Sequence, residues 1–387
     1  MKLKVCVVTG TRAEYGLLRP LLNKMRRDLE IDLQLVVTGM HLSKKFGSTY
    51  AEIEDDGFEI SQKIPILFDS NEALSIANSV GIAVSKFAKS FDFLKPDILV
   101  VLGDRFEIFA AAIAAHLSKL PIAHIHGGES TEGLMDEAFR HSITKMSHLH
   151  FVSTVKYQKR IIQLGENPNS VIMVGALGVE NALNTKFIQR TKLQEKLKLK
   201  FSEKNVLVTF HPVTLDEKSS GIQFNELLTA LDELEDTTLI FTLPNVDTGS
   251  HEIIEMIEKF VSSGFRRYAF PSLGVINYLS CMKLVDAVIG NSSSGLIEAP
   301  SLKKPSINIG DRQRGRVRAD SVIDCSPNYL EIKKALDKAI SSEFLNIVES
   351  CKNPYEFPGT SDIILKTIKA VDLTNLLKKN FYDLEVL

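Results

Sequence analysis

The sequence predicts an α/β protein built from two doubly wound domains, each with a parallel sheet covered by helices on both faces. Short runs rich in Val and Ile recur along the chain, and several are continuously apolar, as in residues 98–102. Such runs are typical of strands buried on both faces. Helix-length segments alternate with them, which favours parallel strands joined by right-handed crossovers. The strand candidates fall into two sets of six on either side of a polar stretch, residues 180–204.

The expected strands and helices follow this alternation. The first set of strands is 3–8, 33–38, 98–102, 121–126, 148–152 and 171–174, and the second is 205–210, 237–242, 267–270, 286–290, 306–309 and 322–324. The clearest helix is 72–94, whose apolar residues recur three or four positions apart, the period of one helix face. The other expected helices are 15–29, 105–118, 132–147, 218–235, 250–263 and 328–341.

This organisation predicts the domain boundaries. We expect an N-terminal domain at 1–178, a C-terminal domain at 179–360, and a C-terminal helix at 361–387 that can return to the first domain. Ligands of doubly wound sheets bind outside the carboxyl ends of the strands, so a cleft between the two domains is the expected site.

Composition excludes several classes of protein. Lys and Arg number 46 against 48 Asp and Glu, a net charge of −2, which argues against nucleic acid as a partner. No apolar stretch reaches the roughly 18 residues that cross a bilayer, so no membrane partner is expected. The four cysteines have no metal-ligand spacing and are typical of reduced thiols, so we expect a cytoplasmic protein without a metal or other cofactor.

Charged residues follow the first and third predicted strands. Gly10 permits a tight turn before Arg12, and Asp104 and Arg105 follow residues 98–102 directly. These side chains suit a ligand site at the carboxyl edge of the sheet. The alternatives are a solvated Arg12 and an Asp104 that caps the helix from residue 105.

The fourth strand leads into a group of acids and bases. His124 and His126 would share one face of a strand, Gly127 and Gly128 would let a ligand approach the backbone, and Glu129 follows them. Asp136 lies shortly afterwards. A general acid–base cluster explains this pattern better than a metal site, because no metal-ligand spacing is present.

The second half carries groups suited to an anion. His211 ends a strand, and Ser292 and Ser293 lie between a strand and a predicted helix that contains Glu298. Free backbone N–H groups and the helix dipole favour an anion at such a turn. Arg312 begins a run of four arginines in seven residues. The alternatives are a structural His211, a helix cap made by the serines and a solvated face of arginines.

These motifs together resemble the UDP-N-acetylglucosamine 2-epimerase family. The motifs are GTRAE (10–14), LGDR (102–105), HIHGGE (124–129), RHSITK (140–145), FHP (210–212), GNSSSGLIEAP (290–300) and GDRQRGR (310–316). The resemblance implies two Rossmann-like domains of the GT-B fold. Within the family the chain is most similar to the hydrolysing branch that makes N-acetylmannosamine for sialic acid synthesis, since the other branch carries Pro at the position of Ala13. Two positions depart from the family: His126 replaces a Glu of many relatives, and residues 38–42 replace an allosteric Gln-His segment.

The resemblance implies an enzyme that converts UDP-N-acetylglucosamine and water to N-acetylmannosamine and UDP. UDP is eliminated to leave a 2-acetamidoglucal, which water then hydrates. The implied acids and bases are Asp104, His126, Glu129 and Asp136. The implied substrate contacts are Arg12, Ala13, Arg105, His211, Ser292, Ser293, Glu298 and Arg312. The main alternative substrate is UDP-2,4-diacetamido-2,4,6-trideoxyglucose (UDP-N,N'-diacetylbacillosamine), on a legionaminic acid route; a GT-B glycosyltransferase and a non-catalytic sensor are weaker alternatives.

The helices also predict an assembly. Residues 105–118 are apolar almost all round, so both faces of this helix must be covered. Relatives form dimers, or tetramers built as dimers of dimers, so we expect a homo-oligomer in which helices of the first domain pack between subunits. The alternative is that helix 72–94 covers 105–118 within one chain.

Overall fold

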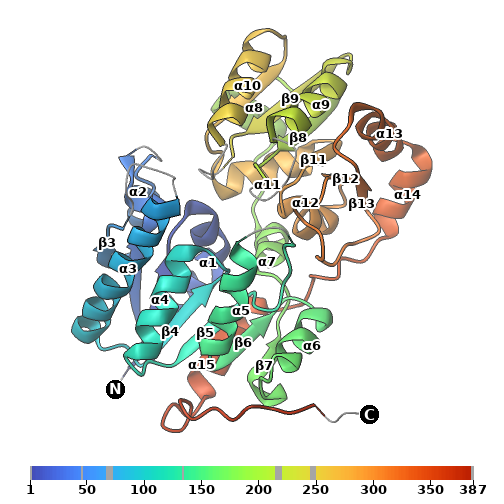
Figure 1. The fold of residues 1–387 in the computed structure, drawn as a ribbon. Coiled ribbons are helices and arrows are strands. Elements are labelled where there is room, and N and C mark those ends of the chain that lie inside the picture. The colour runs from blue at the N-terminus through green and yellow to red at the C-terminus, as the bar shows by residue number, and fades with distance from the viewer. Residues whose placement is uncertain are drawn as a thin grey trace. The chain divides into compact units, whose positions relative to one another are not determined.

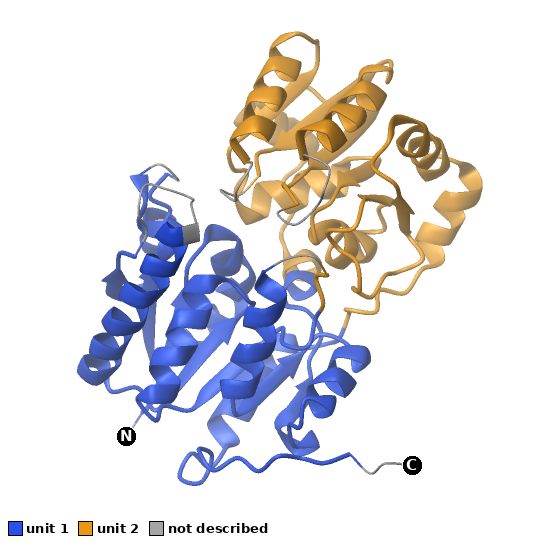
Figure 2. Ribbon diagram, viewed as in Figure 1, with its two compact units in different colours: residues 1–129, 135–180, 357–387 blue, residues 130–134, 181–356 orange. Residues whose placement is uncertain are grey.

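The computed structural model describes residues 2–44, 47–66, 73–132, 135–213, 220–244 and 250–384, which form two compact units (Figure 2). Unit 1 comprises Met1–Glu129, Met135–Glu180 and Phe357–Leu387, and unit 2 comprises Ser130–Leu134 and Asn181–Glu356. The units therefore divide after Glu180 and Glu356, where the sequence placed boundaries after 178 and 360. In addition, the short segment Ser130–Leu134 groups with unit 2.

Unit 1 contains a seven-stranded sheet in which every paired strand runs parallel (Figure 1). In sheet order the strands are β3 (Ile60–Ile64), β2 (Ile31–Thr38), β1 (Leu3–Thr9), β4 (Ile98–Leu102), β5 (Ile122–Ile125), β6 (Leu149–Val152) and β7 (Val171–Met173). The sequence predicted all of these except β3. This strand lies at the sheet edge and is mostly half-buried, so it lacks the continuous apolar run that identifies the others.

Two cores cover the two faces of this sheet. Successive side chains of a strand point to opposite faces of a sheet. In β1, Val5 and Val7 therefore belong to one core, and Cys6 and Val8 belong to the other. The first core includes α1 (Arg12–Arg27) and α15 (Thr360–Ala370), and the second includes α3 (Ala73–Leu94), α4 (Phe106–Leu117) and α5 (Asp136–Met146).

Helix α4 is enclosed within one chain. It packs against both α3 and α5 as well as the sheet, and Ile108, Ala111 and Ala115 are fully buried. Helices α3 and α5 of the same chain therefore cover α4, which agrees with the alternative that named helix 72–94 and adds α5. The homo-oligomer itself stays a prediction.

The C-terminal segment belongs to unit 1. Ile364 and Ile368 of α15 join the core around α1. The helix ends at Ala370, so the predicted helix over 361–387 is too long; residues 371–384 continue without a further helix of more than one turn. The remaining helical segments described in unit 1 are η1 (Gly39–Leu42), α2 (Tyr50–Asp55), α6 (Val155–Gln163), η3 (Pro168–Ser170) and the first half of α7 (Leu177–Asn184).

Unit 2 repeats the same architecture with six parallel strands (Figure 1). In sheet order they are β10 (Arg267–Phe270), β9 (Thr237–Thr242), β8 (Lys204–Thr209), β11 (Ala287–Gly290), β12 (Ser306–Ile309) and β13 (Val322–Cys325). The helices are α8 (Arg190–Leu197), α9 (Ser220–Asp232), α10 (Ser250–Ser262), α11 (Gly274–Leu284), α12 (Ser294–Ile297), η4 (Ala299–Leu302), α13 (Tyr329–Ala339) and α14 (Ser342–Ser350). The polar stretch 180–204 is not only a linker, because Leu193 of α8 is buried in the core of unit 2.

Each sheet has a topological switch point, where the strand order reverses beside the first strand of the unit. The switch lies between β1 and β4 in unit 1 and between β8 and β11 in unit 2. Ligands of open parallel sheets bind at the carboxyl ends of the strands at such a point. Gly290 shows how closely the strands approach there: its φ is 140°, and a Cβ would lie 1.9 Å from the Thr209 carbonyl oxygen.

Within the described part of the chain, no helix has the length and apolar character needed to span a bilayer.

Candidate active site

Arg140 organises the acidic residues that follow β4 and β5 in unit 1. Its guanidinium is 1% exposed and donates hydrogen bonds to the carboxylates of Asp104 and Glu137 and to the Glu129 carbonyl oxygen, the last at 3.1 Å. Buried arginine pairs of this kind fix their carboxylates in one orientation. Arg105, not Asp104, occupies the N-cap of α4. The interpretation of Asp104 as the cap of this helix is therefore wrong. Its carboxylate instead accepts a hydrogen bond from Arg140, which lies on α5.

The two histidines of the HIHGGE motif have different surroundings. Strand β5 ends at Ile125, and His126 has a φ of +64°, so the two side chains do not share a strand face as predicted. His124 is fully buried and its Nε2 lies 2.8 Å from the Gly103 carbonyl oxygen. Burial lowers the pKa of His124 to about 3, so its imidazole is neutral and holds the β4 end in place.

His126 and Glu129 lie near one another. The Leu177 backbone N–H donates to Nε2 of His126 at 3.4 Å, so the neutral ring carries its proton on Nδ1. That nitrogen is 3.9 Å from Oε1 of Glu129, which also accepts a 3.0 Å hydrogen bond from Ser153. Both side chains are more than nine-tenths buried. The structure thus brings two predicted acid–base residues together.

Asp136 is the first residue of α5 and is half-buried. It precedes Arg140 by four positions, so the two side chains emerge on the same face of the helix. Asp136 therefore lies on the helix face that also binds Asp104. Among the predicted catalytic residues, Asp104, Glu129 and Asp136 are connected to Arg140 by contact or by helix position.

Two buried glutamates near the turn after β1, Glu14 and Glu107, were missed by the sequence interpretation. Thr11 caps α1 and forms a capping box with Glu14, which is 6% exposed. Arg12 is half-buried and Ala13 is exposed. Arg105 donates to Glu107 at 2.9 Å, and Glu107 is fully buried beside Gly10. The Thr-x-x-Glu spacing signals the capping box, but only the fold places Glu107 beside it.

In unit 2, Asn291 connects three predicted substrate-binding segments. Its side chain bonds both backbone groups of His211, accepting from the N–H at 2.7 Å and donating to the carbonyl at 2.8 Å. The backbone carbonyl oxygen of Asn291 accepts hydrogen bonds from the side chains of Arg312 at 3.1 Å and Gln313 at 2.9 Å. The structure thereby joins His211, the serine turn and Arg312. Asn291 was missed as a site residue, although its place between Gly290 and Ser292 was a signal.

The serine turn begins a short helix. Ser293 occupies the N-cap of α12 without a side-chain capping bond, and α12 is only four residues long. Ser292 lies 3.2 Å from Ser294 between their hydroxyl oxygens, and Ser294 bonds the Tyr278 hydroxyl at 2.5 Å. The hydroxyls therefore form a chain with Tyr278. Glu298 is half-buried and forms the C-cap of α12.

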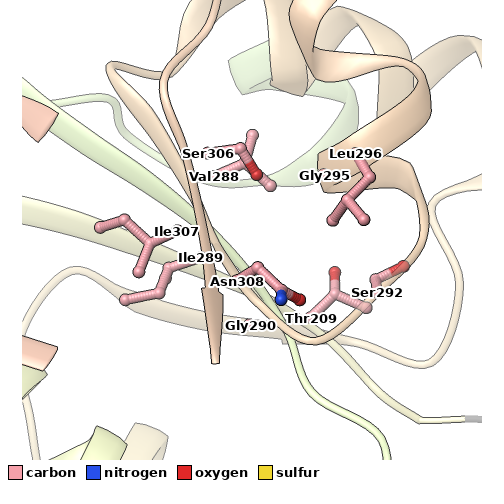
Figure 3. Close-up of a pocket in the computed structure, with 10 residues that line it drawn as sticks. All are labelled: Thr209, Val288, Ile289, Gly290, Ser292, Gly295, Leu296, Ser306, Ile307 and Asn308. Atoms are coloured by element: carbon pink, nitrogen blue, oxygen red, sulfur yellow. The ribbon is translucent and has the colours of Figure 1, made fainter. Parts of the chain in front are cut away.

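A small pocket lies under this turn (Figure 3). It is lined by Thr209, Val288, Ile289, Gly290, Ser292, Gly295, Leu296, Ser306, Ile307 and Asn308. Only Ser292 among the predicted site residues lines it. The Asn308 side chain donates to Asp324 at 2.7 Å, and its amide oxygen is buried without a hydrogen-bond partner.

Among the residues that the structure describes, no three His, Cys, Asp or Glu side chains gather so that they could hold a metal ion. The expectation of a substrate cleft between the domains stays a prediction from the sequence.

Comparison with solved structures defines the class of fold. A UDP-GlcNAc 2-epimerase from Neisseria meningitidis bound to UDP-GlcNAc superposes with a TM-score of 0.80 at 19% identity, over 95% of this chain and 100% of that one. An MnaA–UDP structure from Staphylococcus aureus gives a TM-score of 0.79 at 19% identity, over 99% and 100% of the two chains. The protein thus has two parallel-sheet, Rossmann-like domains of the GT-B type, as predicted.

Sequence comparison then identifies the family. The family described as UDP-N-acetylglucosamine 2-epimerase matches residues 23–369, and this chain belongs to it. The GDP/UDP-N,N'-diacetylbacillosamine 2-epimerase (hydrolyzing) of Campylobacter jejuni is 42% identical over 99% of this chain and 100% of its own. The polysialic acid biosynthesis protein P7 of Escherichia coli is also 42% identical, over 98% and 97%. The UDP-N,N'-diacetylbacillosamine 2-epimerase (hydrolyzing) of Legionella pneumophila is 35% identical over 96% of both chains.

Proposed function

We propose that the protein is a hydrolysing 2-epimerase whose substrate is UDP-N,N'-diacetylbacillosamine. The products would be UDP and the 2-epimeric 2,4-diacetamido-2,4,6-trideoxy sugar. The proposal is carried by the names of two relatives, 42% and 35% identical over nearly the whole chain, which are hydrolysing epimerases of this sugar. The alternative substrate of the sequence analysis therefore replaces UDP-N-acetylglucosamine as the favoured one.

UDP-N-acetylglucosamine is the second candidate. It is favoured by the polysialic acid biosynthesis protein at 42% identity and by a UDP-N-acetylglucosamine 2-epimerase of Neisseria meningitidis at 31% identity. The two sugars differ at C4 and C6, where one carries an acetamido group and a methyl and the other carries two hydroxyls. A pocket that hydrogen-bonds hydroxyls rejects the analogue lacking them strongly, so one substrate should dominate.

The reaction has two steps that share a glycal intermediate. A base removes the proton from C2 while the bond from C1 to the diphosphate oxygen breaks, and UDP leaves with that electron pair. Water then adds its oxygen to C1, loses a proton to a base, and an acid delivers a proton to C2 on the opposite face. Inversion at C2 needs groups on both faces of the ring, so more than one carboxylate or imidazole must take part.

Unit 1 supplies these acids and bases. We assign them to Asp104, His126, Glu129 and Asp136, with Asp104 and Asp136 the strongest candidates for C2. The support is their common relation to Arg140, which binds Asp104 directly and lies one helical turn after Asp136. His126 stands where many relatives have Glu, and its Nδ1 lies 3.9 Å from Glu129, so the carboxylate favours the protonated imidazole.

Unit 2 is assigned the nucleotide. Arg312 and the Ser292–Ser293 turn are proposed to stabilise the charge that develops on the departing diphosphate, with His211 beside them and Glu298 accepting from the ribose hydroxyls. Preorganised donors of this kind stabilise a transition state more than the ground state. The support is Asn291, whose bonds hold His211 and Arg312 at fixed positions around the serine turn. In unit 1, Arg12, Ala13 and Arg105 complete the proposed contacts to substrate.

The decisive experiment incubates the protein with each nucleotide sugar in deuterated water and follows the products by NMR. For UDP-N,N'-diacetylbacillosamine we expect release of UDP, a free reducing sugar with inverted C2, and one deuterium at C2. UDP-N-acetylglucosamine and the GDP form of the bacillosamine sugar serve as the comparison arms. Faster turnover of UDP-N-acetylglucosamine would reverse the substrate assignment, and sugar release without deuterium at C2 would contradict the epimerase mechanism.

We also propose a cytoplasmic homo-oligomer, a dimer or tetramer, on the strength of the resemblance alone. The enclosure of α4 removes the structural argument for a subunit contact there. The outer face of α3 carries exposed apolar side chains, among them Leu74 and Ile82. Sedimentation velocity at micromolar concentration should show a species larger than one chain, and a monomer at every concentration would contradict the assembly.

A further inference from the structure

Two buried glutamates lie at the switch point of unit 1 and have no role in the mechanism above. Glu14 is 6% exposed, and its Oε2 accepts hydrogen bonds from the backbone N–H groups of Gly10 at 2.7 Å and Thr11 at 3.2 Å. Glu107 is fully buried, and its Oε1 accepts from Nε of Arg105 at 2.9 Å. One glutamate therefore holds the turn that carries Arg12, and the other holds Arg105.

Both carboxyl groups flank the same residue, Gly10. Glu14 binds its N–H, and a Cβ on Gly10 would lie 2.5 Å from Cγ and 2.9 Å from Oε1 of Glu107. Gly39, with a φ of +57°, closes the other side, where a Cβ would lie 3.2 Å from the same Oε1. Both carboxyl groups thus lie against Gly10, where the backbone has no room for a larger residue.

The remaining oxygen of each carboxyl group has no hydrogen-bond donor. Oε1 of Glu14 and Oε2 of Glu107 are both buried without a partner. Two ionised carboxylates can only accept, so neither could satisfy the other, and burying both charges together is costly. A single proton on the pair would turn one of these oxygens into a donor and remove one of the charges.

We propose that Glu14 and Glu107 share one proton, and that the singly charged pair positions Arg12 and Arg105 to bind the anionic part of the substrate. The second half of this inference rests on the proposed function, and the first half does not. Aspartic proteases share a proton between two carboxyls for the same physical reason. Here the pair would act through the two arginines, so both glutamates are positioning residues.

The electrostatic environment agrees with this geometry. Burial raises the pKa of Glu14 to about 8, the charge of Glu107 adds to the rise, and Arg105 and the two backbone hydrogen bonds oppose it. The other charged groups around the pair are Arg12 on α1 and Glu52 on α2, which attract one another. His41 on η1 is neutral, because burial lowers its pKa to about 4.

The charge balance gives the pair a function. With one proton, Glu14, Glu107 and Glu52 together carry two negative charges, which balance the two positive charges of Arg12 and Arg105. Loss of that proton adds a third negative charge, which opposes the binding of a diphosphate, and the two carboxylates repel one another beside Gly10. Affinity for UDP should therefore weaken as the pH rises through about 8.

The shared proton is tested by stability, which does not depend on any enzymatic activity. The pKa of Glu14 is raised from 4.5 in the unfolded chain to about 8 in the folded one, so the folded state holds an extra proton between these values. Stability should then fall as the pH rises from about 4.5 to about 8 and level off above it. Glu14→Gln keeps an acceptor for the turn and does not titrate. The difference in melting temperature between wild type and variant should therefore decrease steadily over this range.

Two further variants serve as an alternative and a control for the melting-temperature measurement. Glu107→Gln removes the negative charge that raises the pKa of Glu14, so it too should reduce the slope, and it replaces Glu14→Gln if that variant does not fold. Glu166→Gln is the matched control, because it removes another buried glutamate of unit 1 whose pKa is lowered to about 2. It should lower the melting temperature by a similar amount at every pH above 4.5. A wild-type slope identical to that of both Glu14→Gln and Glu107→Gln would overturn the shared proton.

Infrared difference spectroscopy gives a direct signature. Wild type near neutral pH should show the C=O stretch of a protonated, buried carboxylic acid, which disappears in Glu14→Gln and above pH 8. A spectrum without this band at neutral pH would overturn the proposal as firmly as the stability result.

The positioning role is tested by the affinity for UDP, measured by calorimetry below and above pH 8. Wild type should bind on the order of tenfold more weakly at the higher pH, which corresponds to about one pKa unit of coupling. Glu14→Gln should bind with little pH dependence, whereas Glu14→Ala, which loses the brace on the turn, should bind weakly at both. Equal wild-type affinity at both pH values would overturn the positioning role. Absence of UDP binding at every pH would instead contradict the proposed function, while the stability and infrared results would still decide on the shared proton.

Discussion

Glu14 and Glu166 are two glutamates of unit 1 with nearly equal burial and opposite acidity. Glu14 is 6% exposed and Glu166 is 1% exposed. Burial raises the pKa of Glu14 to about 8, with a further rise from Glu107. Burial also raises the pKa of Glu166, but hydrogen bonds from His150, Lys145 and Lys379 outweigh it and bring the value to about 2.

The pKa values of these two residues differ because their hydrogen-bond partners differ, since their burial is nearly the same. Glu166 has the Nζ atoms of Lys145 and Lys379 at 2.6 Å and Nε2 of His150 at 3.0 Å, so it ties α5, β6 and the C-terminal tail together. Glu14 has another carboxyl group and backbone N–H donors at the carboxyl edge of β1. Fully compensated charge indicates a structural role, and incompletely compensated charge indicates a place where a ligand or a proton is still to act. Asp104 lies between these cases, since it has one buried cation and is partly exposed.

The largest expected effect concerns Asp104. Asp104→Asn should lower turnover by ~10²–10⁴, the usual cost of a lost acid or base, and leave the affinity for UDP nearly unchanged. The matched control is Glu137→Gln, which changes the other carboxylate on Arg140 and should lower turnover by less than about tenfold. Steady-state kinetics and calorimetry with UDP measure both. Equal losses of UDP affinity and turnover would show that Asp104 binds the nucleotide instead.

Next in size is the loss of the Glu166 carboxylate. Glu166→Ala should lower the free energy of unfolding by ~3–5 kcal/mol, because it removes a buried carboxylate that Lys145, Lys379 and His150 share as a partner. Turnover at a temperature where the variant is folded should be unchanged. Urea unfolding followed by circular dichroism measures the first quantity. A stable variant with impaired turnover would invert the comparison and place Glu166 in the site.

The pH dependence of the same residue follows from its lowered pKa. The stabilisation from Glu166 should be fully present above about pH 4.5 and should be lost as the pH falls through about 2. The stability difference between wild type and Glu166→Gln should accordingly shrink in acid. This is the opposite direction to Glu14, whose contribution becomes unfavourable as the pH rises. Melting curves for both variants over one pH series compare the two, and a difference for Glu166 that stays constant down to pH 2 would contradict the assignment.

The smallest expected effect is that of Lys379→Ala. It removes one of the three partners of Glu166, and with it the bonds from Nζ to the carbonyls of Lys145 and Ser147. A hydrogen bond to a charged group contributes about 1.5–3 kcal/mol, and the two remaining partners of Glu166 should reduce the loss toward the lower figure. Limited proteolysis should cut the tail after α15 faster than in wild type. Unchanged cleavage would show that Phe381, which packs on Gly165, holds the tail without the lysine.

Much of the fold was predictable because its signals are local. Strands β4, β9, β10 and β12 have the predicted bounds, and in β4 the signal is a continuous apolar run that is buried on both faces. Edge strand β3 lacks that run and was missed. Helix α4 was recognised as apolar all round, but its sequence could not say whether a neighbouring helix or another subunit covers it, because the answer depends on where α3 and α5 pack.

The sequence by itself identified the motifs that follow β1, β4, β5, β8 and β11. These motifs indicate the family, and the alternation of strands and helices indicates the two Rossmann-like domains. Each motif is contiguous, so its turn, glycine or cap follows from neighbours in the chain. Tertiary structure alone decided which of these residues contact one another. Arg140 reaches Asp104 across 36 positions, Asn291 binds His211 across 80, and Glu107 packs beside the turn that Glu14 braces. Such contacts depend on the strand order at each switch point, and the protonation of the buried groups depends on the contacts.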